Sequence, residues 1–528
     1  MNALRSFFTA ILLSFGLHAS LGAATADAAP LPQSEAPPAS PEFKLQGLQF
    51  QGNTLLLSDT LLQALGPVLG KHYDLAGLQA LADRISDIYT ERGYLFVRAE
   101  LPPQEVLAGQ VQIHIVEGRL GAAVVQSDTP DWAQQAQPFV AALQEGAPVR
   151  GALLERTGLI LSDLPGVQAD TQLQPGTQDG QTALNVTLTP TERFSGEVGL
   201  DNQGNRFSGQ QRAHANLNLN SPFLLGDQIK LYTLTTDEAL WLGSLSYSLP
   251  MGGDGLRGTA SLARTSYQLG KDFASLQAYG TAKVVAAGLS YPWLRSQPAN
   301  LSFLGNYQYK QLHDNKDSTQ TNTHKTSQSL PLTAQFDARD NWGAGGISYG
   351  ALTWTPGRLR LDSTLLAADV GQTRGRYQKL NLDVTRVQQL SPSLSLQARV
   401  AAQWASQNLD SSESFTLGGP SGVRAYPTGE TNGDEGQLTQ LELRWAQGQY
   451  APYVFHDWGR VTVNANPNLL ALPAPVQSRA GAGFGLRLAS GPWRADASLA
   501  YRTVGGLPTS DTSRPGHLRG WFSLSHVF

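Results

Sequence analysis

The chain has 528 residues, no cysteine and a formal net charge of −4. The lack of cysteine excludes a disulfide framework and any thiolate metal site. The slightly acidic balance gives no electrostatic reason to expect a nucleic-acid partner. Beyond the N-terminus, no stretch reaches the roughly 18 apolar residues that a membrane-spanning helix needs.

The N-terminus predicts a secretory signal peptide over residues 1–28. Arg5 supplies the positive region, residues 7–17 the apolar region, and residues 26–28 (Ala-Asp-Ala) a small-residue cleavage site. A Pro-rich linker is expected over 29–42, because five prolines lie within residues 30–42 and oppose a helix. The mature chain is therefore expected to leave the cytoplasm without a helical anchor.

Residues 43–190 predict two small α/β units, 43–119 and 120–190, of about 75 residues each, which is enough for a small core. The first is expected to contain strand 43–51, helix 58–65, a longer helix from the N-cap Asp74 to Gly93, and strands 94–101 and 110–117. The second is expected to contain strand 122–126, helices 137–144 and 152–161, and a hairpin of strands 167–174 and 182–189. The two units share a layout but no obvious sequence identity.

Residues 191–528 predict a transmembrane antiparallel β-barrel, because the helical period disappears and alternation takes its place. Along 394–404, apolar residues at the even positions alternate with polar residues at most odd positions, as in a strand with one apolar and one polar side. About sixteen strand candidates follow, and single-chain bacterial barrels have even strand numbers. The last strand, 520–528, ends on a terminal Phe. With the export signal, this pattern indicates the Gram-negative outer membrane.

Several local motifs sit in a characteristic order on this layout. They are Leu154-Glu155-Arg156 with Asp163-Leu164-Pro165-Gly166, then 201–204 (Asp-Asn-Gln-Gly), then 417–419 (Leu-Gly-Gly) with Val423-Arg424-Ala425-Tyr426-Pro427, and finally Phe455-His456-Asp457-Trp458-Gly459. Across essentially the whole mature chain, this order resembles the transporters of two-partner secretion, the haemolysin and filamentous-haemagglutinin secretion/activation family. Many members of that family have Gly where this chain has Ala425. Some also carry a plug helix, which the Pro-rich linker does not supply, so either the plug is absent or loops alone close the lumen.

The resemblance implies two periplasmic POTRA domains followed by a sixteen-stranded barrel in the outer membrane. It implies a translocator that captures an unfolded periplasmic exoprotein and passes it to the cell surface without nucleotide hydrolysis. An insertase for outer-membrane proteins and a solute channel or receptor remain alternatives. An enzyme is the least expected reading, and no cofactor, metal or nucleic acid is expected.

The resemblance also implies roles for individual residues. The loop motif Val423–Pro427 is expected to fold back into the lumen, where Arg424 meets Asp457, with Phe455 and Gly459 supporting it; the alternative is a surface Arg in a Gly-rich loop. The segment 154–167 is the expected functional part of the second POTRA domain, although its leucines fit a helix core better. Phe522, Leu524 and Phe528 are expected to form the signal read by the barrel-assembly machinery, or merely a last strand that faces outer-membrane lipid.

Polar residues on the strands are expected to face the lumen. They are His214, Asn216, Asn218, Arg399, Gln403, Glu442, Arg444, Arg494 and Asp496. Two readings stay open for them: a wet wall for a passing polypeptide, or internal salt bridges that hold the barrel shut. The glycine-rich run 481–485 superficially resembles a nucleotide loop, but it opens a period-two strand and no helix follows.

Overall fold

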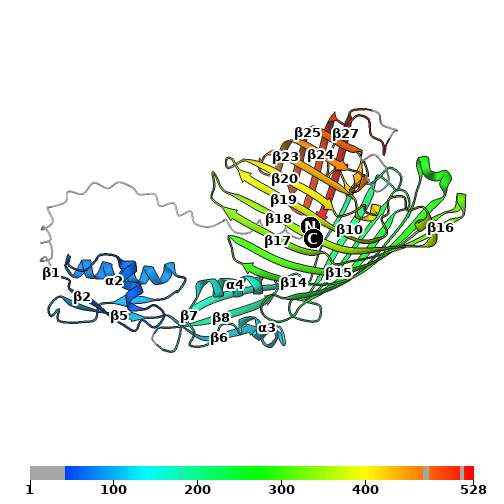
Figure 1. Ribbon diagram of the computed structural model, residues 1–528. Helices are drawn as coiled ribbons and strands as arrows, with labels where there is room; N and C mark the ends of the chain where they lie inside the picture. The colour runs from blue at the N-terminus through cyan, green and yellow to red at the C-terminus, as the bar shows by residue number, and fades with distance from the viewer. Residues whose placement is uncertain (1–41, 179, 468–474, 512–515) are drawn as a thin grey trace, which may run out of the picture.

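The computed structural model describes residues 42–178, 180–467, 475–511 and 516–528. The expected signal peptide and all of the expected linker except Glu42 lie outside these residues. The expectation that this segment supplies no plug helix therefore also lies outside the described part of the chain. Two small α/β units lead to one end of a closed barrel (Figure 1). Within the described ranges, no helix is both long and apolar enough to cross a membrane.

The first unit packs two helices on a small sheet. Its elements are β1 (Phe43–Lys44), β2 (Gly47–Gln51), α1 (Ser58–Leu65), β3 (His72–Tyr73), α2 (Leu75–Glu91), β4 (Arg98–Glu100) and β5 (Gln110–Val116). The Asp74 side chain accepts a hydrogen bond from the Gly77 N–H and so caps α2 as predicted. One face of α2, including Ile85, is buried against Val111 and Ile113 of β5. The expected strand 94–101 is reduced to the three residues of β4.

The second unit repeats this arrangement with β6 (Arg119–Ser127), α3 (Trp132–Val140), α4 (Gly151–Ser162), β7 (Val167–Pro175) and β8 (Gln181–Pro190). Its sheet has the order β6-β8-β7, with β6 parallel to β8 and β7 antiparallel to it. The sequence predicted this helix over 137–144, which is too far toward the C-terminus, because α3 spans Trp132–Val140. The helix begins at Trp132 because Trp132, Ala136 and Phe139 share one face that is buried in the core of this unit.

The barrel is built from β9 (Phe194–Asp201), β10 (Arg212–Asn220), β11 (Gln228–Thr236), β12 (Trp241–Pro250), β13 (Arg257–Gln268), β14 (Ala278–Arg295), β15 (Ala299–Lys316), β16 (Thr321–Ser329), β17 (Leu332–Asp340), β18 (Gly346–Leu361), β19 (Gly375–Gln389), β20 (Leu394–Ala405), β23 (Glu435–Trp445), β24 (Tyr450–Thr462), β25 (Val476–Ser490), β26 (Trp493–Val504) and β27 (Leu518–Val527). Both β16 and β17 pair with β15 and with β18. They are two halves of one strand interrupted at Leu330-Pro331, where proline has no N–H to donate. The barrel therefore has sixteen strands, as predicted, and β27 closes it against β9.

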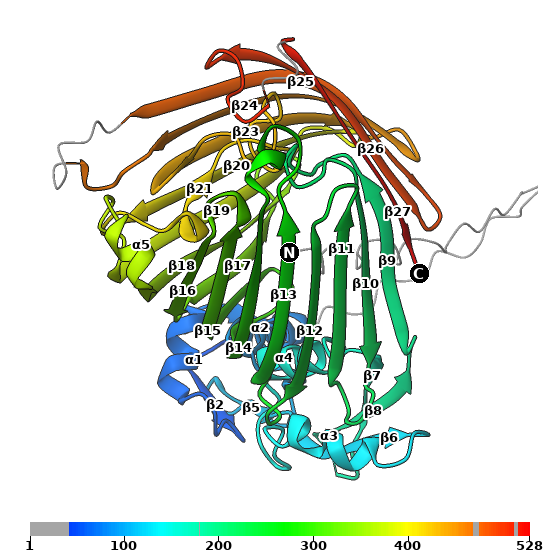
Figure 2. The same cartoon turned by 90° about the vertical axis from the view of Figure 1, so that its right-hand side faces the viewer.

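Short helical segments lie in the loops, where the sequence predicted none. The clearest is α5 (Ser363–Ala367), which is capped by Asp362. A single turn is too short to show a helical period, which explains the omission. The longest loop that the structure describes completely, residues 406–434, joins β20 to β23 and contains the small hairpin β21 (Phe415–Thr416) and β22 (Asn432–Gly433). We call it the lumen loop. Figure 2 shows the barrel turned by 90°, with the second α/β unit at the ends of β12–β14, and Figure 1 shows the first unit farther from the barrel, beyond the second.

Candidate functional site

The lumen loop folds back into the barrel and its tip is buried. The Val423 N–H donates to the Leu417 carbonyl at 2.6 Å, and the Gly419 N–H donates to the Tyr426 carbonyl at 3.0 Å. Val423, Ala425 and Tyr426 are at most 1% exposed. Ala425 does not lie in the left-handed region of backbone space, so this turn does not require glycine at position 425.

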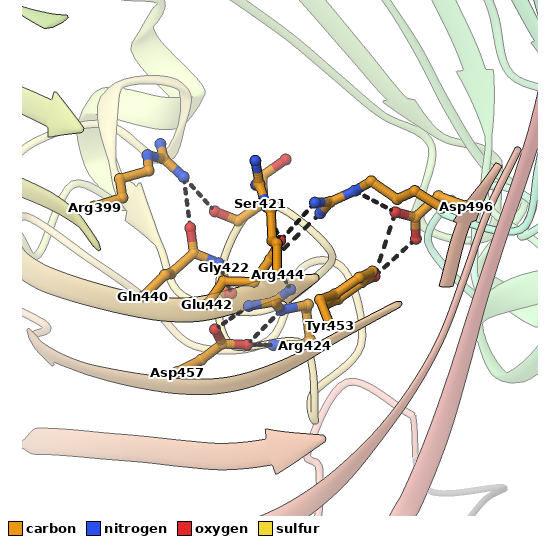
Figure 3. A network of polar contacts seen from close by, with 11 residues as sticks. Arg399, Ser421, Gly422, Arg424, Gln440, Glu442, Arg444, Tyr453, Asp457 and Asp496 are labelled. Atoms are coloured by element: carbon orange, nitrogen blue, oxygen red, sulfur yellow. Dashed lines mark hydrogen bonds and ion pairs between the residues drawn. The ribbon is translucent and has the colours of Figure 1, made fainter. Parts of the chain in front are cut away.

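Arg424 lies against Asp457 of β24 (Figure 3). Its Nη2 is 2.7 Å from Asp457 Oδ1, its Nε is 2.9 Å from Oδ2, and its backbone N–H donates to Oδ2 at 3.0 Å. The guanidinium carbon is 3.5 Å from the centre of the Phe455 ring. This planar, bidentate geometry is the strongest that a guanidinium can make with a carboxylate.

Glu442 of β23 extends the pair into a network. It accepts from Arg424 Nη1 at 2.9 Å and from Arg487 of β25 at 2.5 Å, and it also pairs with Arg444. Arg487 Nε in turn lies 2.8 Å from Asp496 of β26. Three arginines thus meet three carboxylates across four strands and the lumen loop. Sequence reasoning placed Glu442, Arg444 and Asp496 in the lumen but did not connect them to Arg424.

The floor beneath the loop is a row of small residues that sequence reasoning set aside. A Cβ at Gly481 would lie 2.3 Å from the Ala425 Cβ, and one at Gly483 would lie 2.6 Å from the Phe455 ring. Gly459 is similarly close to the side chain of Leu417. Gly481 therefore makes room for the loop, whereas Gly483 and Gly485 make room for the rings of Phe455 and Tyr453 on β24. The alternation of these glycines was the available signal.

The far side of the tip is bound to the segment between β26 and β27. Glu430 is fully buried and accepts from the backbone N–H groups of Thr509 and Ser510 at 3.0 and 2.8 Å. Burial alone would raise the pKa of Glu430, but these hydrogen bonds outweigh it and hold the pKa below its usual value. The Tyr426 hydroxyl donates to the Val504 carbonyl at 2.7 Å.

The stem of the lumen loop carries a second ionic cluster. Glu413 lies 2.7 Å from Lys310 of β15 and 2.8 Å from Lys379 of β19. Asp410 lies 2.8 Å from Lys325 of β16. Burial would raise the pKa of Asp410 and of Glu413, but the lysines outweigh it and lower both values. We call these five residues the stem cluster, and no sequence pattern pointed to it.

The lumen loop also touches both strands of the seam where β27 meets β9. The Thr428 hydroxyl donates to the Gln203 carbonyl, just after β9, at 2.8 Å. The Trp521 indole N–H of β27 donates to the Arg424 carbonyl at 2.6 Å. At the other end of the seam, Phe528 exchanges backbone hydrogen bonds with Gly196.

The expected assembly signal thus forms the last strand of the closed barrel. Phe522 and Phe528 are each 48% exposed. Both readings of these residues, a lipid-facing strand and an assembly signal, are compatible with this position.

The motif of the second α/β unit lies against the barrel. The Arg156 guanidinium donates to the Asp254 carbonyl, in the turn between β12 and β13, at 3.0 Å, and to the Pro292 carbonyl, near the end of β14, at 2.8 Å. Asp163 makes a bidentate pair with Arg295 at 2.7 and 2.8 Å.

The rest of the motif continues this contact. Glu155 accepts from the Gln297 N–H, Pro165 accepts from the Ser221 hydroxyl, and a Cβ at Gly166 would lie 2.8 Å from Asn220. Leu164 is buried and lies against Gly226, whereas Leu154 packs on the core of its own unit. The sequence singled out this segment but not its contact surface.

Most of the other residues predicted to face the lumen make polar contacts with the barrel strands and turns or with the lumen loop. Arg399 pairs with Asp383 at 2.6 Å, His214 lies 3.6 Å from Asp201, and the Gln403 amide donates to the carbonyls of Glu413 and Asp434 in the lumen loop. Asn218 reaches Ser195, and Arg494 binds carbonyls of its own turn. In this state these residues bind their neighbours, which agrees with the expectation of internal contacts that hold the barrel shut. Within the described residues, no group of His, Asp or Glu side chains could hold a metal ion.

Comparisons with known proteins agree with this architecture. Residues 180–488 match the family model "Haemolysin secretion/activation protein ShlB/FhaC/HecB", and residues 43–118 match "POTRA domain, ShlB-type". The chain is 28% identical over 445 residues to the heme/hemopexin transporter protein HuxB of Haemophilus influenzae, covering 80% of this chain and 78% of that one. It is 25% identical over 419 residues to the outer membrane transporter CdiB of Dickeya dadantii, covering 78% and 73%.

A solved structure supports the fold. CdiB from Escherichia coli aligns with a TM-score of 0.75 at 20% identity, covering 94% of this chain and 93% of that one. The two α/β units are therefore POTRA domains, and the barrel is that of an outer-membrane transporter rather than an enzyme. The family model matches more than half of the chain, and the chain belongs to the haemolysin secretion/activation protein family ShlB/FhaC/HecB.

Proposed function

We propose that this transporter captures an unfolded partner exoprotein with its POTRA domains and passes it through the barrel lumen to the cell surface. The observation that carries the proposal is the lumen loop, which folds back into the lumen and is held there by polar contacts and ion pairs. Such contacts can be exchanged one by one for contacts with a passing chain. No nucleotide is available outside the cytoplasm, so folding of the cargo at the surface would give the direction.

The route begins in the periplasm. We propose residues 1–28 as the export signal, residues 29–42 as a linker, POTRA domains over 43–119 and 120–190, and the barrel over 191–528. We also propose that the barrel-assembly machinery reads Phe522, Leu524 and Phe528 during insertion. The POTRA 2 motif would hold the second domain at the mouth of the barrel, so that captured cargo is delivered to the lumen.

The capture edge that we favour is β7. It is bonded to β8 on one side, and the sheet ends there in the described part of the chain. All but two of its nine residues are exposed, and its first residue follows Gly166 at the barrel. An extended peptide can add to such an edge through backbone hydrogen bonds with little regard to its sequence.

The absence of native cysteine makes this edge testable. We would introduce Gln172→Cys on β7, stall a cargo that carries a single thiol, and measure disulfide crosslinking in intact cells. Matched controls are Gln126→Cys on the other edge of the same sheet and Gln79→Cys on α2. Crosslinking through residue 172 alone supports capture by β7, whereas equal crosslinking at all three positions contradicts it.

The function as a whole is tested by deleting the gene and comparing secreted, periplasmic and outer-membrane proteins by mass spectrometry. Loss of one large exoprotein from the medium, with outer-membrane barrels unchanged, is the expected result. Depletion of barrels would instead identify an insertase. If neither changes while the gene is expressed, conductance and solute uptake would test a channel.

A further inference from the structure

The outward surface of the long strands β13–β19 carries a group of cations at one height. Alternation along each strand separates inward from outward positions. Lys310, Lys325 and Lys379 reach the lumen loop and therefore define the inward face. The residues on the opposite face of these strands include Arg264, Lys283, Arg358, Arg360 and Arg376, and all five are exposed. We call these five residues the outer belt.

The cations on the two faces of these strands differ in whether they have a carboxylate partner. Inside, each of the three lysines has a carboxylate partner. Among the residues that the structure describes, no side chain of the outer belt takes part in an ion pair or a hydrogen bond. The outward positions above the apolar band on these strands contain no Asp or Glu. The belt is therefore a cationic surface without an internal counter-charge.

The strand register places like charges of this surface directly opposite each other, which destabilises the surface unless anions are bound to it. Arg264 lies directly opposite Lys283, and Arg358 lies directly opposite Arg376. Opposite side chains in an antiparallel pair are about 5 Å apart at Cβ, and like charges there destabilise the sheet. Two like-charged pairs on one surface indicate that anions from outside the chain neutralise them.

The height of the belt identifies where those anions lie. On β19, Arg386 is paired with Asp340 near the periplasmic end, and Arg376 is ten residues away (386 − 376 = 10). Ten strand residues span about 33 Å, or about 25 Å of height at the usual tilt of barrel strands, which matches the apolar band of an outer-membrane barrel. The outward residues Leu380, Leu382 and Val384 lie between these two arginines. The belt thus stands at the outer edge of the hydrocarbon, at the level of lipid headgroups.

Below each cation pair is an apolar groove on the lipid-facing surface. One groove includes Ala260, Ala287 and Tyr307, and Ala260 and Ala287 lie four residues below Arg264 and Lys283. The other includes Trp354 and Leu380, which lie four residues below Arg358 and Arg376. Small residues such as Gly305, flanked by aromatic rings, leave room for acyl chains. Each groove therefore begins about 13 Å along the strand from its pair of cations.

We propose that the outer belt binds the phosphorylated glycolipid of the outer leaflet, lipopolysaccharide, through its phosphates. One phosphate group lies between Arg264 and Lys283, and a second lies at Arg358, Arg360 and Arg376. The two pairs are separated by three strand spacings, about 14 Å. Gln311, Thr326 and Gln328 lie between them in register and offer hydrogen bonds to sugar. The acyl chains occupy the two grooves below. This proposal does not depend on the identity of the cargo or on the route of secretion.

The test uses the full-length protein in detergent with purified diphosphorylated lipopolysaccharide, followed by native mass spectrometry and thermal unfolding. The variants are Arg264→Gln with Lys283→Gln, Arg358→Gln with Arg376→Gln, and all four together. Arg460→Gln is the matched control, because Arg460 is an exposed outward arginine on β24, outside the belt. Heat-modifiable migration on gels checks that each barrel has folded.

We expect wild type and Arg460→Gln to bind the lipid, each double variant to bind it about tenfold more weakly, and the quadruple variant to show no specific binding. Without lipid, the quadruple variant should unfold at a higher temperature than wild type, because the like-charge pairs are gone. Arg358→Lys with Arg376→Lys should preserve binding. Equal binding by the quadruple variant would overturn the proposal. Equal binding of enzymatically dephosphorylated lipid, or full competition by millimolar inorganic phosphate, would overturn it as well.

Discussion

At the scale of single residues, Arg424 and Asp457 hold the tip of the lumen loop. Both are buried, and removing one partner of a buried ion pair costs about 3–5 kcal/mol, because the other charge is left unpaired. Arg424→Ala leaves Asp457 without its bidentate partner, whereas Asp457→Ala leaves Arg424 in contact with Glu442. We therefore expect both variants to impair secretion by at least tenfold, and Arg424→Ala to be the more severe.

Secretion of the exoprotein and heat-modifiable migration of the barrel measure this prediction. The double variant serves as the internal control, because residues that act through one contact are not additive. It should be no worse than the poorer single variant while the barrel still assembles. Normal secretion by either single variant would contradict a role for the pair.

Ala425 and Gly481 form a matched pair of small residues. An alanine at 481 would place its Cβ 2.3 Å from that of Ala425. Overpacking of this kind costs about 1–3 kcal/mol, so we expect Gly481→Ala to displace the loop and raise the resting conductance in planar bilayers. Ala425→Gly alone should resemble wild type. The double variant should recover only part of the closed state, because its Cβ at position 481 would still lie 2.9 Å from the Tyr501 carbonyl oxygen. A double variant as leaky as Gly481→Ala would show that the contact with residue 425 is not responsible.

At the scale of elements, the lumen loop is held at its stem as well as at its tip. Asp410 and Glu413 have folded-state pKa values below their usual ones. A depressed carboxyl pKa contributes stability above the unfolded pKa, about 4, and loses it as the pH falls through the folded value. We therefore expect the conductance to stay low down to about pH 4 and to rise below it.

Conductance recorded from pH 7 to pH 3 checks this expectation, and Asp410→Asn with Glu413→Gln separates the stem from the other lumen carboxylates. This variant should be leakier than wild type at pH 7 and should respond less to acid. If it shows the conductance and the acid response of wild type, the stem cluster does not hold the loop.

The docking of the second POTRA domain is another contact between elements. Asp163 is half exposed, and its pair with Arg295 joins α4 to the end of β14. Reversal to Asp163→Arg should bring two arginines together and weaken docking, and adding Arg295→Asp should restore it. Limited proteolysis of the connection at residues 191–193 and secretion of the exoprotein are the measurements. Equal protease sensitivity in all three proteins would mean that this pair does not position the domain.

At the scale of the whole molecule, most of the fold could be predicted from the regular alternation of apolar and polar residues. The sixteen strands follow from period-two patterns, and α2 follows from its spacing and its Asp74 cap. The resemblance pointed to Arg424 and Asp457, and the structure places them in contact. The stem cluster could not be predicted from the sequence, because Lys310 on β15 and Glu413 in the lumen loop are about a hundred residues apart. A strand pattern shows which face a side chain occupies but not which distant loop it meets.

The seam between β27 and β9 distinguishes the routes that the whole barrel could use. Leu524 lies opposite Leu200 across it, and opposite residues in an antiparallel pair are close enough for a disulfide. A double cysteine variant, Leu200→Cys with Leu524→Cys, can therefore close the seam covalently in a chain that has no other thiol. Cargo that passes through the lumen does not require these strands to separate, so the oxidised variant should secrete as well as the same protein after reduction. An insertase or lateral exit would require separation, and reductant would then restore a blocked activity. Leu524→Cys alone controls for the loss of the leucine, and a block that appears only in the oxidised double variant would show that the seam must open.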